Sequence, residues 1–417
     1  MRTGTILILG GGFAGVRVAL DLEKTLGTRA NIIIVDKNPY HLFLPALYEV
    51  AAAYGAPRDP YTIMLRRTVA IPFKEIFDGK RITHIQAAVL DGDLEQRIIR
   101  TDTGVEIPYD FLIIGLGSEA SDFGIAGVTD YAYGFRTLDD AIAINTRLTD
   151  LFQEAERGER RLPIRVLVCG AGLTGIETAT EIGSCVKTFA RECKLRGQPT
   201  HIMLFDANPD LLPNASDGER ERIKARLTAR GVALVSGARV SAIESSRIHL
   251  MDGRSFDGDI IIWTAGVRAP GVLERLHGLD LTPQGKMVVS EQLNTRRYPN
   301  VFGVGDAIHF MDHATQKPIP AMAYLAMDHG KIAAQNILRI IEGKELRTHK
   351  PSYGIWVAPV GGKYAVARLP GGIIFGGFAA WLFREFIDLN YFISILPFKK
   401  ALSLFWREIK VFTANDL

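Results

Sequence analysis

Residues Thr5 to Leu22 read TILILGGGFAGVRVALDL, and this stretch decides the fold. It begins as a buried strand, continues through Gly10, Gly12 and Gly15 in GxGxxG spacing, and becomes a helix. About twenty residues later a second strand, NIIIVD, ends in Asp36. The glycines let the backbone approach a pyrophosphate, the helix N-terminus binds it, and the carboxylate holds ribose hydroxyls. The stretch therefore predicts a parallel α/β unit that binds a dinucleotide.

The same pattern returns in the middle of the chain. RVLVCGAGLTGIETATEI places Gly170, Gly172 and Gly175 between a strand and a helix, and HIMLFD is a strand that ends in Asp206. The gap of 31 residues between Gly175 and Asp206 is long, which predicts an extended helix or loop around residues 185–198. An acid at Asp206 repels a 2′-phosphate, so the pattern favours NAD over NADP.

Two dinucleotide sites in one chain imply electron transfer between a nicotinamide and a flavin. YDFLIIGLGS, residues 109–118, and DIIIWTAGV, residues 259–267, have the strand-plus-glycine form of crossings between two such domains. LNTRRYPNVFGVGDAI, residues 293–308, ends a strand in Gly-Asp, so Asp306 is expected to bind a flavin ribityl hydroxyl. The alternative role for Asp306 is a plain helix N-cap.

Composition excludes several function classes. The net charge is +3 over 417 residues and no basic run exceeds two residues, which argues against nucleic-acid binding. Cys169, Cys185 and Cys193 are too widely spaced for a disulfide framework or a zinc site, so no metal is expected, and Cys169 is expected to be a buried small hydrophobe. The N-terminus runs directly into a strand without a leader, which predicts a cytoplasmic protein. The longest uncharged run, residues 369–383, is too short and too interrupted to span a bilayer.

The C-terminal stretch FKKALSLFWREIKVF, residues 398–412, predicts a basic amphipathic helix. Its apolar stripe comprises Phe398, Leu402, Phe405, Ile409 and Phe412, and its basic residues are Lys399, Lys400, Arg407 and Lys410. A preceding stripe comprises Leu382, Phe386, Leu389, Ile393 and Leu396, and Pro397 is expected to break the two helices into a hairpin. Such a hairpin either packs on the protein's own core or lies in a membrane interface, where Phe405, Trp406 and Phe412 would anchor it and the basic residues would face anionic head groups.

Three further segments carry a family resemblance: NPYHLFLPALYEVA, residues 38–51; DFGIAGV, residues 122–128; and GAGLTGIE, residues 170–177. Together with the tail, the chain resembles type II NADH dehydrogenases, single-subunit flavoenzymes that pass electrons from NADH to membrane quinone without pumping protons. The resemblance implies two Rossmann-like domains and a C-terminal amphipathic helical region that anchors the protein to a membrane. Residues 1–119 and 291–343 are expected to bind FAD, residues 120–290 NADH, and residues 345–417 the membrane.

The motifs and the resemblance together predict three sets of site residues. For FAD these are Gly10, Gly11, Gly12, Phe13, Ala14, Gly15, Asp36, Lys37, Val89, Gly117, Asp306 and Ala323. For NADH they are Gly170, Gly172, Leu173, Thr174, Gly175, Asp206, Ala265 and Gly266, with Thr174 expected to make only a local backbone contact. For quinone they are Tyr324, Ala326, Met327 and Asp328.

The quinone segment departs from the family's pattern. The family's AQxAxQ motif is AYLAMD here, residues 323–328, so Tyr324 and Asp328 replace two amides. Both side chains can still hydrogen-bond a quinone carbonyl, but an ionised Asp328 changes the electrostatic environment. The type of quinone, ubiquinone or menaquinone, therefore stays open.

Glu177, on the first turn of the helix after Gly175, is the expected catalytic residue. By resemblance it influences nicotinamide and quinone handling and passes protons, whereas the alternative is an acid that merely suits the helix dipole. His41 and Tyr48 are expected either to line the flavin or to pack.

The resemblance also implies a homodimer that is peripheral to the cytoplasmic side of the inner membrane. The alternatives are a sulfide:quinone oxidoreductase, a soluble NADH-dependent reductase of ferredoxin or another small acceptor, and a flavin-binding redox sensor or scaffold. The first needs cysteines at the flavin, including one in the C-terminal third, and none lies beyond Cys193. A soluble reductase has no use for the apolar hairpin, and a sensor would not turn over NADH with a quinone.

Overall fold

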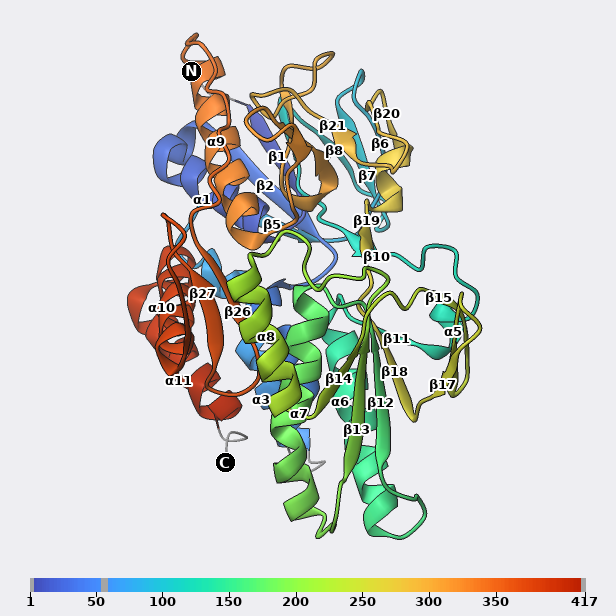
Figure 1. The fold of residues 1–417 in the computed structure, drawn as a ribbon. Coiled ribbons are helices and arrows are strands. Elements are labelled where there is room, and N and C mark those ends of the chain that lie inside the picture. Colours follow the sequence, from blue (N-terminus) through green and yellow to red (C-terminus); the bar gives the residue numbers. More distant parts are fainter. Residues whose placement is uncertain (1–3, 54–58, 414–417) are drawn as a thin grey trace.

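The computed structural model describes residues 4–53 and 59–413, and it forms three units (Figure 1). The first unit combines the blue N-terminal segment with the orange segment near residue 330, at the top of the view. The second unit, largely green, lies below it, and the red C-terminal unit lies at the side of both. The ends of the predicted domains at residues 1–3 and 414–417 lie outside the described residues.

A parallel sheet in the order β22-β9-β1-β2-β5 forms the centre of the first unit. Its middle strand β1 (Thr5–Leu9) is apolar and almost wholly buried, as expected for a parallel strand that is covered on both faces. Helices α1 (Phe13–Leu26) and α9 (Ala323–Ile341) pack against each other beside it. The other strands are β2 (Asn31–Asp36), β5 (Ile82–Gln86), β9 (Phe111–Ile114) and β22 (Val301–Gly303).

The second unit repeats this plan with a parallel sheet in the order β11-β18-β12-β13-β14. The strands are β11 (Tyr133–Gly134), β12 (Ile164–Cys169), β13 (Thr200–Phe205), β14 (Val232–Val235) and β18 (Ile260–Trp263). Helices α6 (Leu138–Glu156), α7 (Leu173–Glu192) and α8 (Asp217–Ala229) complete it. The long gap before Asp206 is therefore an extended helix α7, and the predicted α/β class with two Rossmann-like units is confirmed.

Two short strands carry the crossings between the units. β10 (Glu119–Ala120) pairs antiparallel with β19 (Val267–Arg268). Beyond this crossing, β20 (Leu276–His277) already pairs with β6 (Val89–Asp93) of the first unit. The strand pairing therefore favours a return to the first unit near residue 268 rather than at the predicted boundary of residue 291.

Shorter elements complete the first two units. The strands are β3 (Tyr40–Leu42), β4 (Ala70–Pro72), β7 (Ile98–Thr101), β8 (Glu106–Pro108), β15 (Val240–Glu244), β16 (Arg247–Leu250), β17 (Ser255–Asp257), β21 (Met287–Val288), β23 (Ile308–His309), β24 (Met311–Asp312) and β25 (Lys317–Pro318). The short helices are α2 (Leu47–Ala52), α3 (Asp59–Val69), α4 (Phe73–Ile76), α5 (Val128–Tyr131), η1 (Gly27–Arg29), η2 (Leu44–Ala46), η3 (Gly271–Arg275) and η4 (Gly305–Ala307).

The C-terminal unit is an antiparallel sheet followed by a helical hairpin. The strands β26 (Trp356–Pro359), β27 (Ala365–Arg368) and β28 (Ile374–Gly377) pair in chain order. Helices α10 (Phe378–Ile395) and α11 (Phe398–Thr413) follow and pack against each other, and the break at Pro397 is confirmed. No helix within the described ranges combines the length and apolarity that crossing a bilayer requires.

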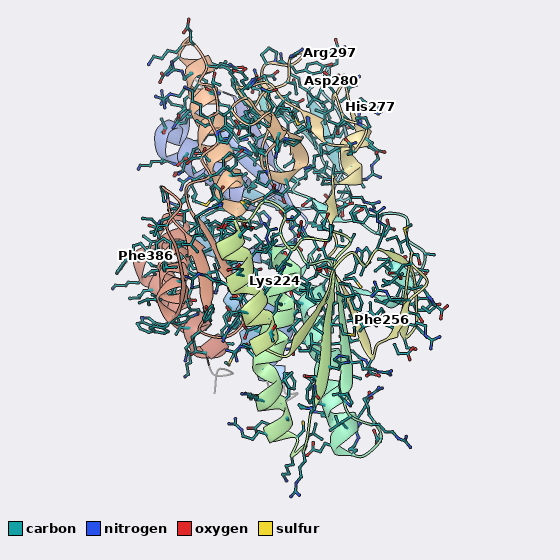
Figure 2. The ribbon with its side chains drawn as sticks, in the orientation of Figure 1. Lys224, Phe256, His277, Asp280, Arg297 and Phe386 are labelled. Carbon is teal, nitrogen blue, oxygen red and sulfur yellow. The ribbon has the colours of Figure 1, made fainter. Side chains whose placement is uncertain are left out.

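Helix α10 turns part of its apolar surface outward and its charged residues inward, whereas Tyr391, Phe392 and the predicted stripe residue Leu396 at its C-terminal end are buried. Leu382 and Phe386 are 55% and 65% exposed, and Phe386 lies at the outer edge of the molecule (Figure 2). Arg384, Glu385 and Asp388, by contrast, are buried. The exposed residues of the predicted stripe therefore do not pack on the protein's own core.

Helix α11 presents a mixed picture. Phe398 and Trp406 are exposed, but the predicted stripe residue Phe412 is buried because the helix rests on the body of the protein through the face that also carries Ala401, Leu404 and Val411. Two of its basic side chains contact the protein rather than solvent alone. Lys400 pairs with Asp78 at 2.9 Å, and Arg407 donates to the Arg67 carbonyl oxygen at 3.2 Å. The expectation that both face head groups is corrected accordingly.

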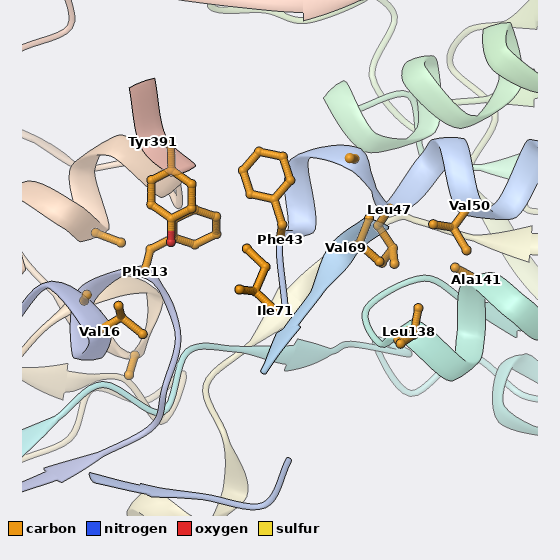
Figure 3. Packing of buried hydrophobic residues seen from close by; sticks show 14 of the residues in the cluster. Phe13, Val16, Phe43, Leu47, Val50, Val69, Ile71, Leu138, Ala141 and Tyr391 are labelled. Carbon is orange, nitrogen blue, oxygen red and sulfur yellow. The ribbon is translucent and has the colours of Figure 1, made fainter. Parts of the chain in front are cut away.

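The hydrophobic core is continuous across the units. Figure 3 shows three rings close together: Phe13 of α1, Phe43 after β3, and Tyr391 of α10. Leu47 and Leu138 lie further along the same cluster. The ring of Tyr391 lies 4.9 Å from that of Phe13 and stacks on Phe43 at 5.5 Å, measured between ring centroids. The C-terminal hairpin is thus packed onto the start of the first glycine turn.

Candidate active site

The two glycine turns have the same hydrogen-bond arrangement. The backbone N–H of Gly11 donates to Asp36 Oδ2 at 2.7 Å, and that of Ala171 donates to Asp206 Oδ2 at 2.7 Å. The other carboxylate oxygen of Asp36 accepts from the Asn38 N–H at 2.8 Å. Each predicted ribose-binding acid therefore lies beside its predicted pyrophosphate-binding turn, because the carboxyl ends of adjacent parallel strands meet at one edge of a sheet.

Glycine is required at the first position of each turn. Gly10 has φ +97° and Gly170 has φ +110°, values that side-chain-bearing residues rarely adopt. A methyl group on Gly10 would collide with the backbone of Gly115, and one on Gly170 would collide with the backbone of Ala265. The turns are thus closed against the two crossing loops that the sequence placed near the cofactors.

The next glycine of each turn faces open space. A Cβ atom on Gly12 or Gly172 would have no neighbour within 4 Å. These glycines are the N-caps of α1 and α7, and neither helix has a side-chain cap. The free N–H groups of both helix starts and the space before them fit the phosphates of a dinucleotide.

Asp306 belongs to a network that joins the units. Its Oδ2 accepts hydrogen bonds from Ser118 Oγ at 2.9 Å and from Arg136 Nη2 at 2.9 Å. Arg136 follows β11 of the second unit, whereas Asp306 follows β22 of the first. Asp306 lies in η4 rather than capping a long helix, so its carboxylate remains available to a ligand hydroxyl beside Arg136.

The predicted quinone segment forms the first turns of α9. Ala323 begins the helix, Tyr324 is 38% exposed, Ala326 is buried and Met327 packs against the core. Asp328 Oδ2 lies 3.4 Å from Nδ1 of His349. Burial lowers the pKa of His349, and this nitrogen has no hydrogen-bond partner among the described residues, so the approach is a close contact rather than an ion pair.

A buried histidine links this segment to the Gly-Asp motif. The N–H of Gly305 donates to His329 Nδ1 at 3.1 Å, and the ring of His349 stands edge-on to that of His329 at 4.7 Å. Burial lowers the pKa of His329 to about 3, so the ring is neutral at physiological pH. It positions the backbone next to Asp306.

His41 connects the first glycine turn to the C-terminal hairpin. It is fully buried; its Nδ1 lies 3.0 Å from the Gly11 carbonyl oxygen and its Nε2 2.7 Å from the Tyr391 hydroxyl. Because the carbonyl can only accept, Nδ1 carries the hydrogen and Nε2 accepts from Tyr391. Burial lowers the pKa of His41 to about 4, which keeps this tautomer neutral.

Glu177 lies on the first turns of α7, facing the charged inner side of α10. Burial raises the pKa of Glu177 to about 7, against the opposing effect of Arg384. Tyr48 of α2 is buried nearby and donates to Glu49 Oε1 at 2.9 Å, and α2 packs on α7. Among the predicted residues, Glu177 therefore has the perturbed environment that proton transfer requires.

The remaining predicted residues lie on the same elements. They are Ala14 and Gly15 in α1; Lys37 after β2; Val89 in β6; Gly117 in the first crossing; Leu173, Thr174 and Gly175 in α7; and Gly266 in the second crossing. The expectation for Cys169 is confirmed, since it is buried within β12.

The motifs did not reveal Ser118, Arg136, His329, Arg384 and Tyr391 as site residues. Ser118 and Asp306 are 188 residues apart, and nothing local in the sequence marks them as a pair. The burial of Arg384 could have been predicted from the sequence. Arg384, Glu385 and Asp388 lie outside the apolar stripe of their helix, and that stripe was expected to face a membrane. If the stripe faces a membrane, these charged side chains must point toward the protein.

Comparisons with known proteins agree with this geometry. The family model described as pyridine nucleotide-disulphide oxidoreductase matches residues 4–330. The type II NADH:quinone oxidoreductase of Staphylococcus aureus is 26% identical over 406 residues, which cover 95% of this chain and 98% of that protein.

Solved structures share the fold over almost the whole length. NDH2 from Plasmodium falciparum in complex with NADH has a TM-score of 0.85 at 16% identity and covers 98% of both chains. The sulfide:quinone oxidoreductase of Aquifex aeolicus has a TM-score of 0.77 at 18% identity, covering 94% of this chain and 91% of that one. The family match extends over both glycine turns and most of the sequence, so the chain belongs to the pyridine nucleotide-disulphide oxidoreductase family.

Proposed function

We propose that this protein is a single-subunit NADH:quinone oxidoreductase that transfers two electrons from NADH, through FAD, to a membrane quinone without pumping protons. One observation carries the proposal: a hairpin with an apolar, outward-facing surface is packed directly onto two units that each carry one dinucleotide turn. NADH is soluble and quinone is not, so an enzyme that joins them must reach the bilayer surface. The full-length relatives from Staphylococcus aureus carry the corresponding name.

The family binds FAD and NAD(H), and the residues of the first unit fit FAD. The proposed contacts are the helix start at Gly11 to Gly15 for the pyrophosphate, Asp36 for the ribose and Asp306 for the ribityl chain. Further proposed contacts are Lys37 after β2, Val89 at the start of β6, Gly117 after β9 and Ala323 at the start of α9. When bound, FAD supplies hydride acceptance and two-electron release, while this chain supplies position and electrostatics.

The second unit is the proposed NADH site. The start of α7 at Leu173 and Thr174 offers N–H groups to the pyrophosphate, Ala265 closes the turn, and Gly266 is the next residue of the same crossing. Asp206 would accept the adenosine ribose hydroxyls and repel a 2′-phosphate, so we propose a preference for NADH over NADPH. Glu177 would hold or pass a proton at its carboxyl group.

The hairpin is the proposed membrane contact. The outward apolar residues are Ile373, Phe378, Leu382, Phe386, Ile393, Phe398 and Trp406. Lys399 and Lys410 would face anionic head groups at its edge. The protein would thus be peripheral on the cytoplasmic side of the inner membrane, as a homodimer, with quinone entering near Tyr324, Ala326, Met327 and Asp328.

The alternatives fit less well. A sulfide:quinone oxidoreductase would need reactive cysteines, whereas Cys169, Cys185 and Cys193 are all buried and none lies in the C-terminal third. A soluble ferredoxin reductase gives no reason for large aromatic side chains on the outside of α10. A redox sensor or scaffold would need no acceptor.

The test is anaerobic mixing of the purified flavoprotein with NADH, followed by a ubiquinone or menaquinone analogue. We expect NADH to bleach the flavin faster than NADPH does, and at least one of the two quinones to restore the oxidised spectrum. Bleaching without recovery by either quinone contradicts the proposed acceptor but leaves the NADH site intact. The same mixing with NADPH serves as the control for the nucleotide.

A further inference from the structure

The inner side of the hairpin meets the second unit in a cluster of buried charges centred on Arg384. The guanidinium is 6% exposed; it lies 3.0 Å from Glu49 Oε1 and donates to the Pro45 carbonyl oxygen at 3.2 Å. Asp388 Oδ2 lies 3.3 Å from it and Glu385 Oε1 3.4 Å from it. Arg384 is therefore shared among several acids of the described residues.

The acids come from four helices. Within the described residues the carboxylates around Arg384 are Glu49 of α2, Glu177 and Glu181 of α7, Glu385 and Asp388 of α10, and Glu408 of α11. Tyr48 of α2 also faces the cluster, with Arg384 5.5 Å from its ring centroid. These are the titratable and charged groups that the four packed helices direct at one another.

Glu408 is the member of the cluster whose surroundings most favour the protonated form. Its side chain is 3% exposed, and neither carboxylate oxygen has a hydrogen-bond partner among the described residues. An ionised carboxylate in that position would be desolvated without compensation, which is far more costly than holding a proton. Burial and the neighbouring Asp388 raise the pKa of Glu408 well above its usual range, and burial raises that of Asp388. Glu408 is thus suited to carry a proton at neutral pH, whereas Asp388, whose pKa is raised only to about 6 and which lies beside Arg384, is mostly ionised there.

A pocket connects this cluster to the edge of the hairpin. Its lining includes the charged residues Glu49, Arg384 and Glu408 together with Trp381, Ile409, Phe412 and Thr413 of the hairpin. In the other direction, Glu49 accepts from Tyr48, which lies on the helix packed against α7 and Glu177. The acids therefore span the distance between the surface near the hairpin and the predicted catalytic acid.

We propose that the carboxylates around Arg384, with Glu408 as the member that holds a proton, form a proton store that supplies the reduction of the electron acceptor. This inference rests on the proposed quinone reductase function. Oxidation of NADH by a quinone consumes one proton from solvent, since NADH + H⁺ + quinone gives NAD⁺ + quinol. A carboxylic acid O–H bond breaks as a quinol O–H bond forms, the two electrons come from NADH, and the carboxylate regains its proton from water through the pocket.

The variants Glu408→Gln and Asp388→Asn test this role in the full-length flavoprotein. An amide resembles the protonated acid in shape and charge, so Glu408→Gln keeps the packing but cannot release a proton. Asp388→Asn also cannot release a proton, and it removes one negative charge beside Arg384. The matched control is Glu342→Gln, an exposed acid that pairs with Lys344 at the end of α9. In rapid mixing, we expect flavin bleaching by NADH to keep its rate in all variants.

Reoxidation by a quinone analogue should slow about tenfold or more in the store variants and remain unchanged in the control. Glu408→Ala should recover part of its reoxidation rate when formate or acetate is added, because a small acid can enter the vacated space. A merely structural role would not respond to a small acid.

Infrared spectroscopy gives a readout that does not depend on turnover. The wild-type protein should show the carbonyl stretch of protonated carboxylic acids at neutral pH, and Glu408→Gln should remove part of that band while the control keeps it.

Three outcomes overturn the proposal. The first is that the wild type lacks the infrared band, and the second is that Glu408→Gln reduces the band while flavin reoxidation keeps its rate. The third outcome is slower reoxidation in Glu408→Ala that formate and acetate do not restore. If Glu408→Gln does not fold, Asp388→Asn decides by the same criteria. Failure of the wild type to reduce any quinone instead defeats the proposed function, and the supply role falls with it.

Discussion

Asp36 and Asp206 take equivalent positions in the two units, and each holds the first N–H of its glycine turn. Replacing Asp206 with serine keeps a short acceptor for the Ala171 N–H but removes the negative charge. We expect the KM for NADH to rise about tenfold and the discrimination against NADPH to narrow, because repulsion of the 2′-phosphate is lost. Steady-state kinetics with both nucleotides measure this, and an unchanged ratio would refute the assigned role. Asp252→Ser, at an exposed acid paired with Arg254, is the control.

Glu177 makes stability depend on pH in a direction unusual for an acid. Its pKa is raised from 4.5 to about 7 by burial, so the folded state keeps a proton that the unfolded chain releases. The free energy of unfolding should therefore fall as pH rises from 4.5 to 7, by up to about 3 kcal/mol. Urea denaturation across this window should give a flatter profile for Glu177→Gln than for the wild type. Equal slopes would mean that the carboxyl group is solvated normally.

At the residue scale, the sequence predicted what local spacing encodes. Both glycine turns and their acids follow from strand, turn and helix patterns within a few dozen residues, and Asp306 from its Gly-Asp motif. Arg136, a partner of Asp306, could not be predicted in this way, because it reaches Asp306 only through packing of the two units against each other and belongs to no local motif. The other partner, Ser118, ends the segment YDFLIIGLGS and lies beside Asp306 because β9 and β22 are adjacent parallel strands.

At the scale of elements, α10 exposes large apolar side chains on its outer face while it buries Arg384, Glu385 and Asp388. The double variant Phe386→Ser/Phe398→Ser tests membrane binding, because it removes two exposed aromatic rings and leaves the buried face of the hairpin unchanged. Each ring contributes about 2 kcal/mol on burial, so binding to vesicles with anionic lipids should weaken by at least tenfold. Co-sedimentation with Met251→Ser, an exposed apolar residue of the second unit, is the control. Similar loss in the control would indicate non-specific adhesion.

The hydrogen bond from Tyr391 to His41 transmits the position of α10 to the first glycine turn. Tyr391→Phe retains the ring that stacks on Phe43 but removes the donor. A lost buried hydrogen bond costs about 1 kcal/mol, so reconstitution of the apoprotein should show roughly fivefold weaker FAD binding. Tyr131→Phe, at an exposed tyrosine, should bind FAD like the wild type. Unchanged affinity for Tyr391→Phe would limit His41 to packing.

Element boundaries in the tail were predictable, but the orientation of the tail was not. Pro397 breaks the hairpin because its ring cannot continue a helix, and this is visible in the sequence. Which face of α11 meets the body depends on the small side chain of Ala401 and on neighbours in α3, so the apolar stripe alone could not show that Phe412 is buried and Phe398 exposed.

For the whole molecule, the C-terminal unit is part of the core as well as the proposed membrane contact. Deletion from Gly372 onward would uncover Phe13 and Phe43 and leave Glu49 without Arg384. We expect the truncated protein to lose FAD and to unfold at a lower temperature than the full chain, because apolar surface becomes exposed and a buried acid loses its cation. Flavin absorbance and thermal melting measure this. A truncated protein that keeps its flavin would show that the hairpin serves attachment alone.

The paired strands β10 and β19 have a consequence for evolution. Glu119 lies opposite Arg268 and Ala120 opposite Val267, so the chain leaves the first unit and re-enters it at one point. An insertion whose two ends are neighbours can be exchanged as a cassette without stretching the scaffold that receives it. A lineage could therefore change its electron donor by replacing the inserted unit, provided that the replacement matches the contacts of α7 and α8 with the C-terminal strands. The acceptor side, held by the other two units, would be inherited unchanged.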